Sequence, residues 1–139
     1  MAGLAVCDAN VAVFWLVDDP LSDVAIQAKQ RFEMIAPRLL LSEVANALRA
    51  YVRADRLPFS IAQRHLASLP RQIELRDEND LAPLALRLSV ELDHPAYDCF
   101  YVAMAVTLSV PLVTADARLA RKFKGVTSAE FISLQDWTA

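Results

Sequence analysis

Four acidic side chains that are far apart in the sequence stand where strands and helices are expected to meet: Asp8, Glu43, Asp98 and Asp116. In open α/β sheets, ligands bind beyond the carboxyl ends of the strands, at the point where the strand order changes direction. We therefore expect these carboxylates to converge. Carboxylates in one place raise each other's pKa unless a cation lies between them. Oxygen ligands favour Mg²⁺ or Mn²⁺ over Zn²⁺, so the set predicts a divalent metal site.

Each of these acids also has a structural interpretation when it is considered alone. Asp116 would be a good N-cap and would interact favourably with the helix dipole. Glu43 could be a solvent-facing acid in a first helical turn, and Asp8 could close an Asx turn. Asp98 is harder to explain, because it lies in an otherwise apolar helical segment and burial of a lone carboxylate is costly. The metal hypothesis therefore depends on all four residues together.

The segments that would position these acids alternate between short apolar runs and longer runs of helical periodicity. The short runs predict strands at Leu4–Asp8, Leu39–Leu41, Gln72–Leu75, Val110–Thr114 and Phe131–Ile132. The periodic runs predict helices at Ala9–Leu16, Asp23–Met34, Glu43–Asp55, Phe59–Leu69 and Ala96–Leu108, with two more capped by Asn79 or Asp80 and by Asp116. This alternation predicts an α/β fold with a doubly wound, mostly parallel sheet, formed as a single domain over residues 1–139.

The composition limits the class of protein. The 139-residue chain is 55% hydrophobic with a formal net charge of −3, which excludes a disordered chain, a collagen and a disulfide-stapled extracellular domain. Cys7 and Cys99 lie in apolar runs without metal-binding spacing, so we expect buried thiols in a reduced, cytoplasmic protein. The longest uncharged run, Cys99–Ala115, contains Pro111 and is shorter than the roughly 20 apolar residues of a membrane span. No signal peptide is expected either.

Four segments of the chain carry a resemblance to a known family. They are Val6-Cys-Asp8-Ala-Asn10, Ser42-Glu43-Val-Ala-Asn46-Ala-Leu48, Tyr97-Asp98-Cys-Phe-Tyr101-Val-Ala-Met-Ala105 and Leu112-Val-Thr114-Ala-Asp116-Ala-Arg-Leu119. In this order and at this spacing they resemble the PIN domain, in its VapC toxin branch. The resemblance covers nearly the whole chain.

This resemblance implies a Rossmann-like sheet with strand order 3-2-1-4-5, flanked by helices. It implies that Asp8, Glu43, Asp98 and Asp116 are catalytic metal ligands and that the Thr114 hydroxyl supports them. The implied activity is that of an endoribonuclease, in which a metal-activated water cleaves RNA and leaves 5′-phosphate and 3′-hydroxyl ends. The implied cofactor is Mg²⁺, with Mn²⁺ as the alternative. The implied partners are an RNA substrate, a VapB-type antitoxin and a second copy of the chain in a homodimer.

Several other polar side chains surround the proposed site. By resemblance, Asn10 and Asn46 are polar helpers. Two predicted helices carry basic residues that could contact RNA phosphates, although a solvated helix face explains each cluster equally well. These residues are Arg49, Arg53 and Arg56 after Glu43, and Arg118, Arg121, Lys122 and Lys124 after Asp116. His65 and His94 lack metal-ligand spacing and receive no role, and Tyr101 is assigned to the core.

Two other functions stay open at this point. A catalytically silent PIN-like module would keep the fold and an affinity for RNA but would not turn over substrate. A receiver-type switch domain would carry a phosphoacceptor aspartate, for which Asp77 after the Gln72–Leu75 run is the candidate. The receiver hypothesis is less favoured, because the paired acids expected at the first strand are missing.

Overall fold

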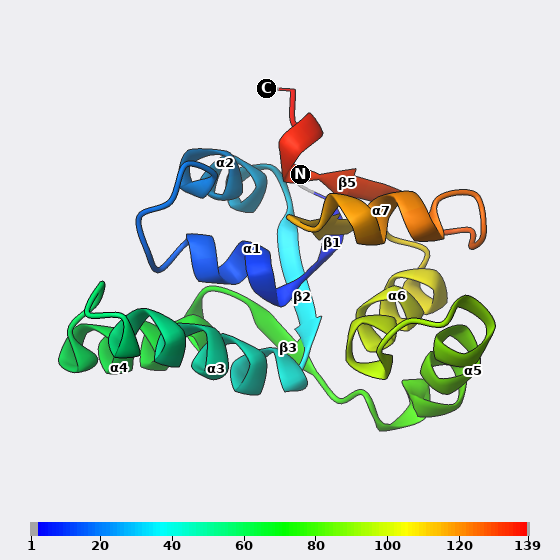
Figure 1. Ribbon diagram of the computed structural model, residues 1–139. Helices are drawn as coiled ribbons and strands as arrows, with labels where there is room; N and C mark the ends of the chain where they lie inside the picture. Colours follow the sequence, from blue (N-terminus) through cyan, green and yellow to red (C-terminus); the bar gives the residue numbers. More distant parts are fainter. Residues whose placement is uncertain (1–2, 139) are drawn as a thin grey trace.

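A parallel sheet of five strands forms the centre of the molecule (Figure 1). The computed structural model describes residues 3–138. The strands are β1 (Leu4–Cys7), β2 (Glu33–Pro37), β3 (Glu74–Arg76), β4 (Leu112–Thr114) and β5 (Phe131–Ser133). Their order, β3-β2-β1-β4-β5, confirms the predicted fold class and strand order. The direction of the order changes at β1, so the carboxyl ends of β1 and β4 border the crevice where α/β proteins bind ligands.

The sheet order excludes the receiver-type alternative. Receiver domains have the order 2-1-3-4-5, in which the third strand lies inside the sheet. Here β3 is an edge strand. Asp77, directly after β3, is exposed beside Arg38, with 4.0 Å between its Oδ2 and the Arg38 Nη1. Asp77 therefore lies away from the β1–β4 crevice.

Helices cover both faces of the sheet, as Figure 1 shows. One face carries α1 (Ala9–Phe14), α2 (Ser22–Arg31), α3 (Leu39–Arg53) and α4 (Phe59–Ser68), and the other carries α5 (Ala82–Leu92), α6 (Ala96–Leu108) and α7 (Ala117–Phe123). Single 3₁₀ turns lie at Leu69–Arg71, Asn79–Leu81 and Leu134–Asp136. Right-handed crossovers explain this division, because the chain runs from β1 to β3 in one direction and returns through β4 to β5 in the other.

The predicted strand at Leu39–Leu41 is wrong, since these residues form the first turn of α3. The second strand is the preceding apolar run, Glu33–Pro37, in which Met34 to Pro37 are buried. Leucine is a good helix former, and Leu40, Val44 and Leu48 repeat at helical spacing along the buried side of α3. Glu43 consequently lies in the second turn of a helix rather than beside a strand end.

The helix that carries Asp98 begins and ends as predicted, at Ala96 and Leu108. Pro95 precedes it as the N-cap, and Ser109 ends it with a left-handed backbone, φ 54°. This α6 helix packs against β1, β2, β4 and α5, which buries Cys99 and residues Tyr101–Ala105. Cys7 and Cys99 are buried free thiols, as expected. No helix within residues 3–138 has the length and apolar character needed to cross a bilayer.

The predicted caps of the helix after β3 are wrong. Neither Asn79 nor Asp80 caps α5, because both belong to a 3₁₀ turn and Leu81 is the N-cap residue. At the other end, Asp93 closes α5 with a left-handed backbone, φ 47°. This tight turn brings the start of α6 directly back against α5.

Candidate metal site

Asp8 is the buried centre of the candidate site. It directly follows β1, is the N-cap of α1, and is only 5% exposed. Its Oδ1 accepts a hydrogen bond from the Ala9 backbone N–H at 2.8 Å. Its Oδ2 accepts from the Thr114 hydroxyl at 2.8 Å and from Asn10 Nδ2 at 3.4 Å. Asp8 does not close an Asx turn, because its carboxylate accepts from the backbone N–H of the next residue, Ala9, rather than from that of Asn10.

Two polar side chains join the turn after β1 to the turn after β4. Thr114 donates its hydroxyl proton to Asp8 and accepts from the Asp116 backbone N–H at 3.0 Å. Asn10 Oδ1 accepts from the Ala115 backbone N–H, also at 3.0 Å. These contacts hold the two strand ends in register, so Asp8 and Asp116 are positioned by a shared set of hydrogen bonds.

Electrostatics shows which acids lie near Asp8. The pKa of the Asp8 carboxyl is raised from 3.8 to about 7. Burial is the main cause, the Thr114 hydrogen bond opposes the shift, and the negative charges of Asp98 and Glu43 add to it. Carboxylates interact in this way only when they are close and poorly screened. The charges of Asp98 and Glu43 therefore act on Asp8, although 90 residues of chain separate Asp8 from Asp98.

Glu43 is held by a tyrosine to which the sequence analysis gave only a core role. Tyr101, fully buried in α6, donates its hydroxyl proton to Glu43 Oε1 at 2.7 Å. Burial, together with the nearby Asp98 charge, raises the pKa of Glu43, and the Tyr101 hydrogen bond opposes that rise. Burial and the Glu43 carboxylate raise the pKa of Tyr101 itself, which keeps the phenol protonated. Asp98 and Tyr101 lie one helical turn apart, and this spacing was the signal in the sequence that Tyr101 could lie beside the acids.

Asp98 is held by a histidine that was assigned no role. His94 Nε2 lies 2.7 Å from Asp98 Oδ2. Lys122, which the sequence analysis grouped with phosphate contacts, lies on the other side of this ring, 3.4 Å from His94 Nδ1. Its Nζ also donates to the Asp93 carbonyl at 2.7 Å. The i, i+4 spacing of His94 and Asp98 indicated in the sequence that these two side chains could be in contact. No feature of the sequence indicated that Lys122 would lie beside His94.

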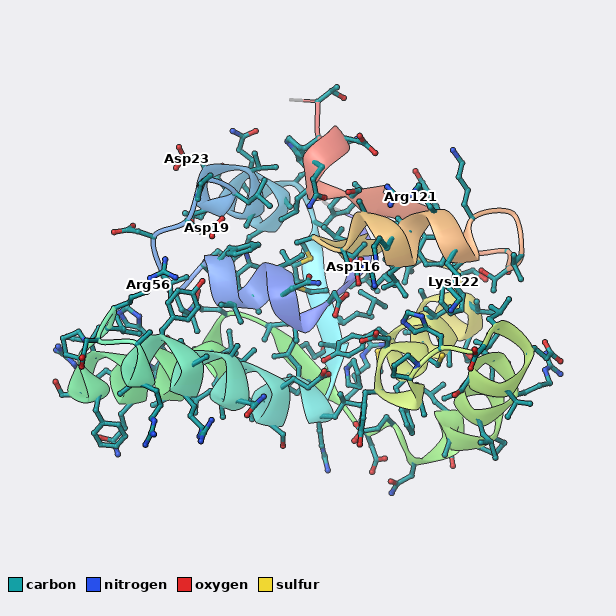
Figure 2. All side chains as sticks on the ribbon, viewed as in Figure 1. Asp19, Asp23, Arg56, Asp116, Arg121 and Lys122 are labelled. Carbon is teal, nitrogen blue, oxygen red and sulfur yellow. The ribbon has the colours of Figure 1, made fainter. Side chains whose placement is uncertain are left out.

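Asp116 caps α7, as its structural interpretation predicted. Its Oδ1 accepts from the backbone N–H groups of Arg118 and Leu119 at 3.0 and 3.1 Å. In Figure 2 Asp116 lies at the inner end of α7, toward the middle of the molecule, with Arg121 and Lys122 farther along the helix. Because capping uses only Oδ1, the Oδ2 oxygen of Asp116 is left for a metal ion.

The donor set suits a hard divalent cation. Glu43, Asp98 and Asp116 each engage one carboxylate oxygen in a hydrogen bond, and within residues 3–138 the other oxygen of each accepts none. In the described part of the chain, no three Asp, Glu, His or Cys side chains approach closely enough to enclose an ion by themselves. Mg²⁺ suits such an open set, because it keeps several waters and binds one or two carboxylates together with substrate phosphates.

The remaining predicted helpers differ in their surroundings. Asn46 is exposed on α3, whereas Asn10 contacts Asp8 directly. The arginines of both basic clusters are exposed, which is compatible with either of their interpretations. The candidate site therefore comprises the four predicted acids and the side chains that hydrogen-bond to them or join their turns, which are Thr114, Asn10, Tyr101 and His94.

We predict that Asp8 makes the metal-free protein less stable as the pH rises. Its pKa is 3.8 when unfolded and about 7 when folded, so the protonated acid favours the fold. That contribution is complete below the unfolded pKa and is lost as the pH rises through the folded pKa. Urea unfolding in chelator, from about pH 4 to about pH 7, should show wild type losing stability relative to Asp8→Asn, which is neutral throughout. Parallel pH profiles of the two proteins would contradict this prediction.

Known proteins resemble this chain in sequence and in fold. The family model described as PIN domain matches residues 5–124. The chain is 40% identical over 87 residues to Ribonuclease VapC1 of Mycobacterium tuberculosis, a match that covers 61% of this chain and 64% of that relative, which is less than two thirds of its length. It is 33% identical over 118 residues to Ribonuclease VapC9 of the same species, covering 84% and 89%. A toxin-antitoxin complex from Klebsiella pneumoniae superimposes with a TM-score of 0.69 at 17% identity, covering 94% and 97%.

Proposed function

This chain belongs to the PIN domain family, and from that premise we propose that it is a VapC-type toxin, an endoribonuclease that depends on a divalent metal ion. The observation that carries the proposal is that Thr114 joins Asp8 to Asp116 at the carboxyl ends of β1 and β4, where the charges of Glu43 and Asp98 also act on Asp8. The relatives named ribonuclease support the reaction class. The carboxylate oxygens of Glu43, Asp98 and Asp116 that accept no hydrogen bond within residues 3–138 support Mg²⁺ or Mn²⁺ as the cofactor.

Asp8, Glu43, Asp98 and Asp116 would hold the ion. A bound Mg²⁺ or Mn²⁺ supplies an activated water and neutralises charge on the scissile phosphate. The protein's part is to keep the acids ionised and oriented: Thr114 holds Asp8, and the Tyr101 phenol holds Glu43. Hydrolysis of this kind leaves 5′-phosphate and 3′-hydroxyl ends on the RNA. Mg²⁺ is our proposed ion in the cell, with Mn²⁺ as its substitute in vitro.

The partners follow from the same proposal. Besides RNA, we expect a VapB-type antitoxin, and the toxin-antitoxin complex with the same fold supports this expectation. We also expect a homodimer, because α5 and α6 expose the large apolar side chains of Leu86, Val90 and Tyr97. An RNA substrate and two free thiols favour the cytoplasm.

The test is cleavage of a structured RNA pool by purified protein in Mg²⁺, Mn²⁺ or EDTA, followed by analysis of the new RNA ends. The proposal predicts cuts that require metal and that carry 5′-phosphates. RNA binding without any cleavage would instead support the catalytically silent module. Cleavage that persists in EDTA would contradict a metal-dependent enzyme.

The basic residues of α7 give a separate prediction about RNA binding. Replacing Arg118 and Arg121 by alanine should weaken binding and lower the slope of log K against log salt by about 0.7 for each lost phosphate contact with a single strand. Binding should be measured with Asp98→Asn in the background, so that the RNA stays intact. Arg87→Ala is the matched control, because Arg87 is an exposed arginine on α5 that pairs with Glu91. An equal slope for both variants would favour the solvated-face interpretation of α7.

A further inference from the structure

The turn between α5 and α6 holds His94 in a defined position. Its backbone N–H donates to the Ser89 carbonyl at 3.1 Å, and its own carbonyl accepts from the Ser89 hydroxyl at 2.6 Å. The left-handed Asp93 precedes it and Pro95 follows it. The side chain is only 13% exposed. These backbone contacts therefore fix the position of the His94 Cα atom, from which the imidazole side chain extends.

Three side chains then surround the ring. The Phe123 ring packs against it in a T-shaped arrangement, with 5.4 Å between centroids and an interplanar angle of 83°. Asp98 Oδ2 lies 2.7 Å from Nε2, and Lys122 Nζ lies 3.4 Å from Nδ1. In Figure 2, Lys122 lies on α7 close to the α5–α6 side of the molecule. The ring is held between a carboxylate and an ammonium group.

The chemistry of these two neighbours selects one form of the imidazole. An ammonium group has only protons to donate, so the Nδ1 that faces Lys122 must offer its lone pair. A carboxylate accepts protons, so the Nε2 that faces Asp98 must carry the hydrogen. Both contacts favour the neutral Nε2–H tautomer. Lys122 itself is anchored by its bond to the Asp93 carbonyl, so it cannot swing away without losing that contact.

We propose that His94 is a positioning residue: anchored by Lys122, its Nε2–H holds one oxygen of Asp98 and leaves the other directed toward the metal site. This inference rests on the proposed metal-dependent function and extends it to a residue outside the acidic set. Hydrogen-bonded partners of metal-ligating carboxylates orient the ligand and tune the site. His94 needs no contact with the ion or the RNA for this role.

The tautomer can be measured directly. The chain has two histidines, which makes the imidazole ¹⁵N spectrum simple to assign. At mildly alkaline pH, His94 should show a protonated Nε2, because Asp98 faces Nε2 and Lys122 faces Nδ1. His65 should show the opposite tautomer, because its Nδ1 lies 2.7 Å from the Leu16 carbonyl oxygen. Lys122→Met should leave His65 unchanged and shift His94 toward a mixture. A protonated Nδ1 on His94 in wild type would overturn the proposal.

Metal affinity gives the second readout, without any RNA. Calorimetric titration with Mn²⁺ should show that His94→Phe, which keeps an aromatic ring but has no N–H, binds about 10- to 100-fold more weakly than wild type. His94→Gln should recover most of the affinity, because its amide N–H can replace Nε2–H. His65→Phe is the matched control and should bind Mn²⁺ as wild type does. A purely structural role of His94 predicts equal losses for Phe and Gln.

The outcomes separate this proposal from the proposed function. If wild type binds Mn²⁺, Asp98→Asn does not, and His94→Phe binds as tightly as wild type, the positioning role is wrong and the metal site stands. If wild type and all variants fail to bind Mn²⁺, both proposals fail. Weak binding by His94→Phe with recovery in His94→Gln supports both.

Discussion

Replacing Asp98 by asparagine should lower metal-dependent RNA cleavage by more than about 100-fold, the upper end of the losses seen for residues that only support a metal ligand. The substitution keeps the size of the side chain, and the asparagine carbonyl can still accept from His94 Nε2. What it removes is the negative charge, which also acts on Asp8 and Glu43. The measurement is initial cleavage rate at saturating Mg²⁺, with circular dichroism to establish that the variant is folded.

The control for this prediction is Asp77→Asn. Asp77 is an exposed aspartate that follows the edge strand β3 and lies away from the β1–β4 crevice. Cleavage by Asp77→Asn should equal that of wild type. Equal cleavage by Asp98→Asn and wild type would mean that the active site is misplaced or that the activity comes from a contaminant. Loss of activity in both variants would mean that charge at the sheet edge matters in general.

The largest loss of stability should come from Phe123→Ala, at about 3–5 kcal/mol in the free energy of unfolding. Phe123 is the last residue of α7 and is fully buried. Its ring packs on Phe131 of β5, with 6.0 Å between centroids, and against His94. Truncation leaves a cavity that a seven-residue helix cannot close by itself. Urea denaturation monitored by tryptophan fluorescence measures the change.

Val126→Ala is the matched control for this core substitution. Val126 lies three residues beyond Phe123 and is 54% exposed, so its truncation should change stability by less than about 0.5 kcal/mol. Similar losses for both variants would show that the end of α7 is not packed as described. Because Phe123 also supports His94, residual folded Phe123→Ala protein should bind Mn²⁺ more weakly than wild type.

Much of the candidate site could be predicted because its signals are local. Asp8 directly follows a short apolar run of strand length, Thr114 ends another, and Asp116 lies two residues beyond Thr114. Parallel strands bring their carboxyl ends to one edge whatever the details of packing. The order of strands and helices along the chain could be predicted for the same reason, since it depends on periodicity over a few residues.

The errors arose where neighbouring residues support two structures. Leu39–Leu41 is apolar enough for a buried strand, but it forms a helix because its apolar residues continue at helical spacing through Leu48. The place beside β1 in the sheet is taken by β2. Asn79 and Asp80 are good capping residues by type, yet the chain forms a 3₁₀ turn there before α5 begins. In each case packing beyond the segment decided between local alternatives of similar energy.

The sequence by itself determined the kinds of groups available, the order of the elements and the family to which the chain belongs. Only the tertiary structure decided which polar groups touch. Tyr101 reaches Glu43 across 58 residues of chain, and Lys122 reaches His94 across 28. No periodicity records such contacts, because they depend on how helices from different crossovers pack against the sheet. The acids and the i, i+4 pair of His94 and Asp98 were therefore visible in the sequence, whereas the contacts of Tyr101 with Glu43 and of Lys122 with His94 were not.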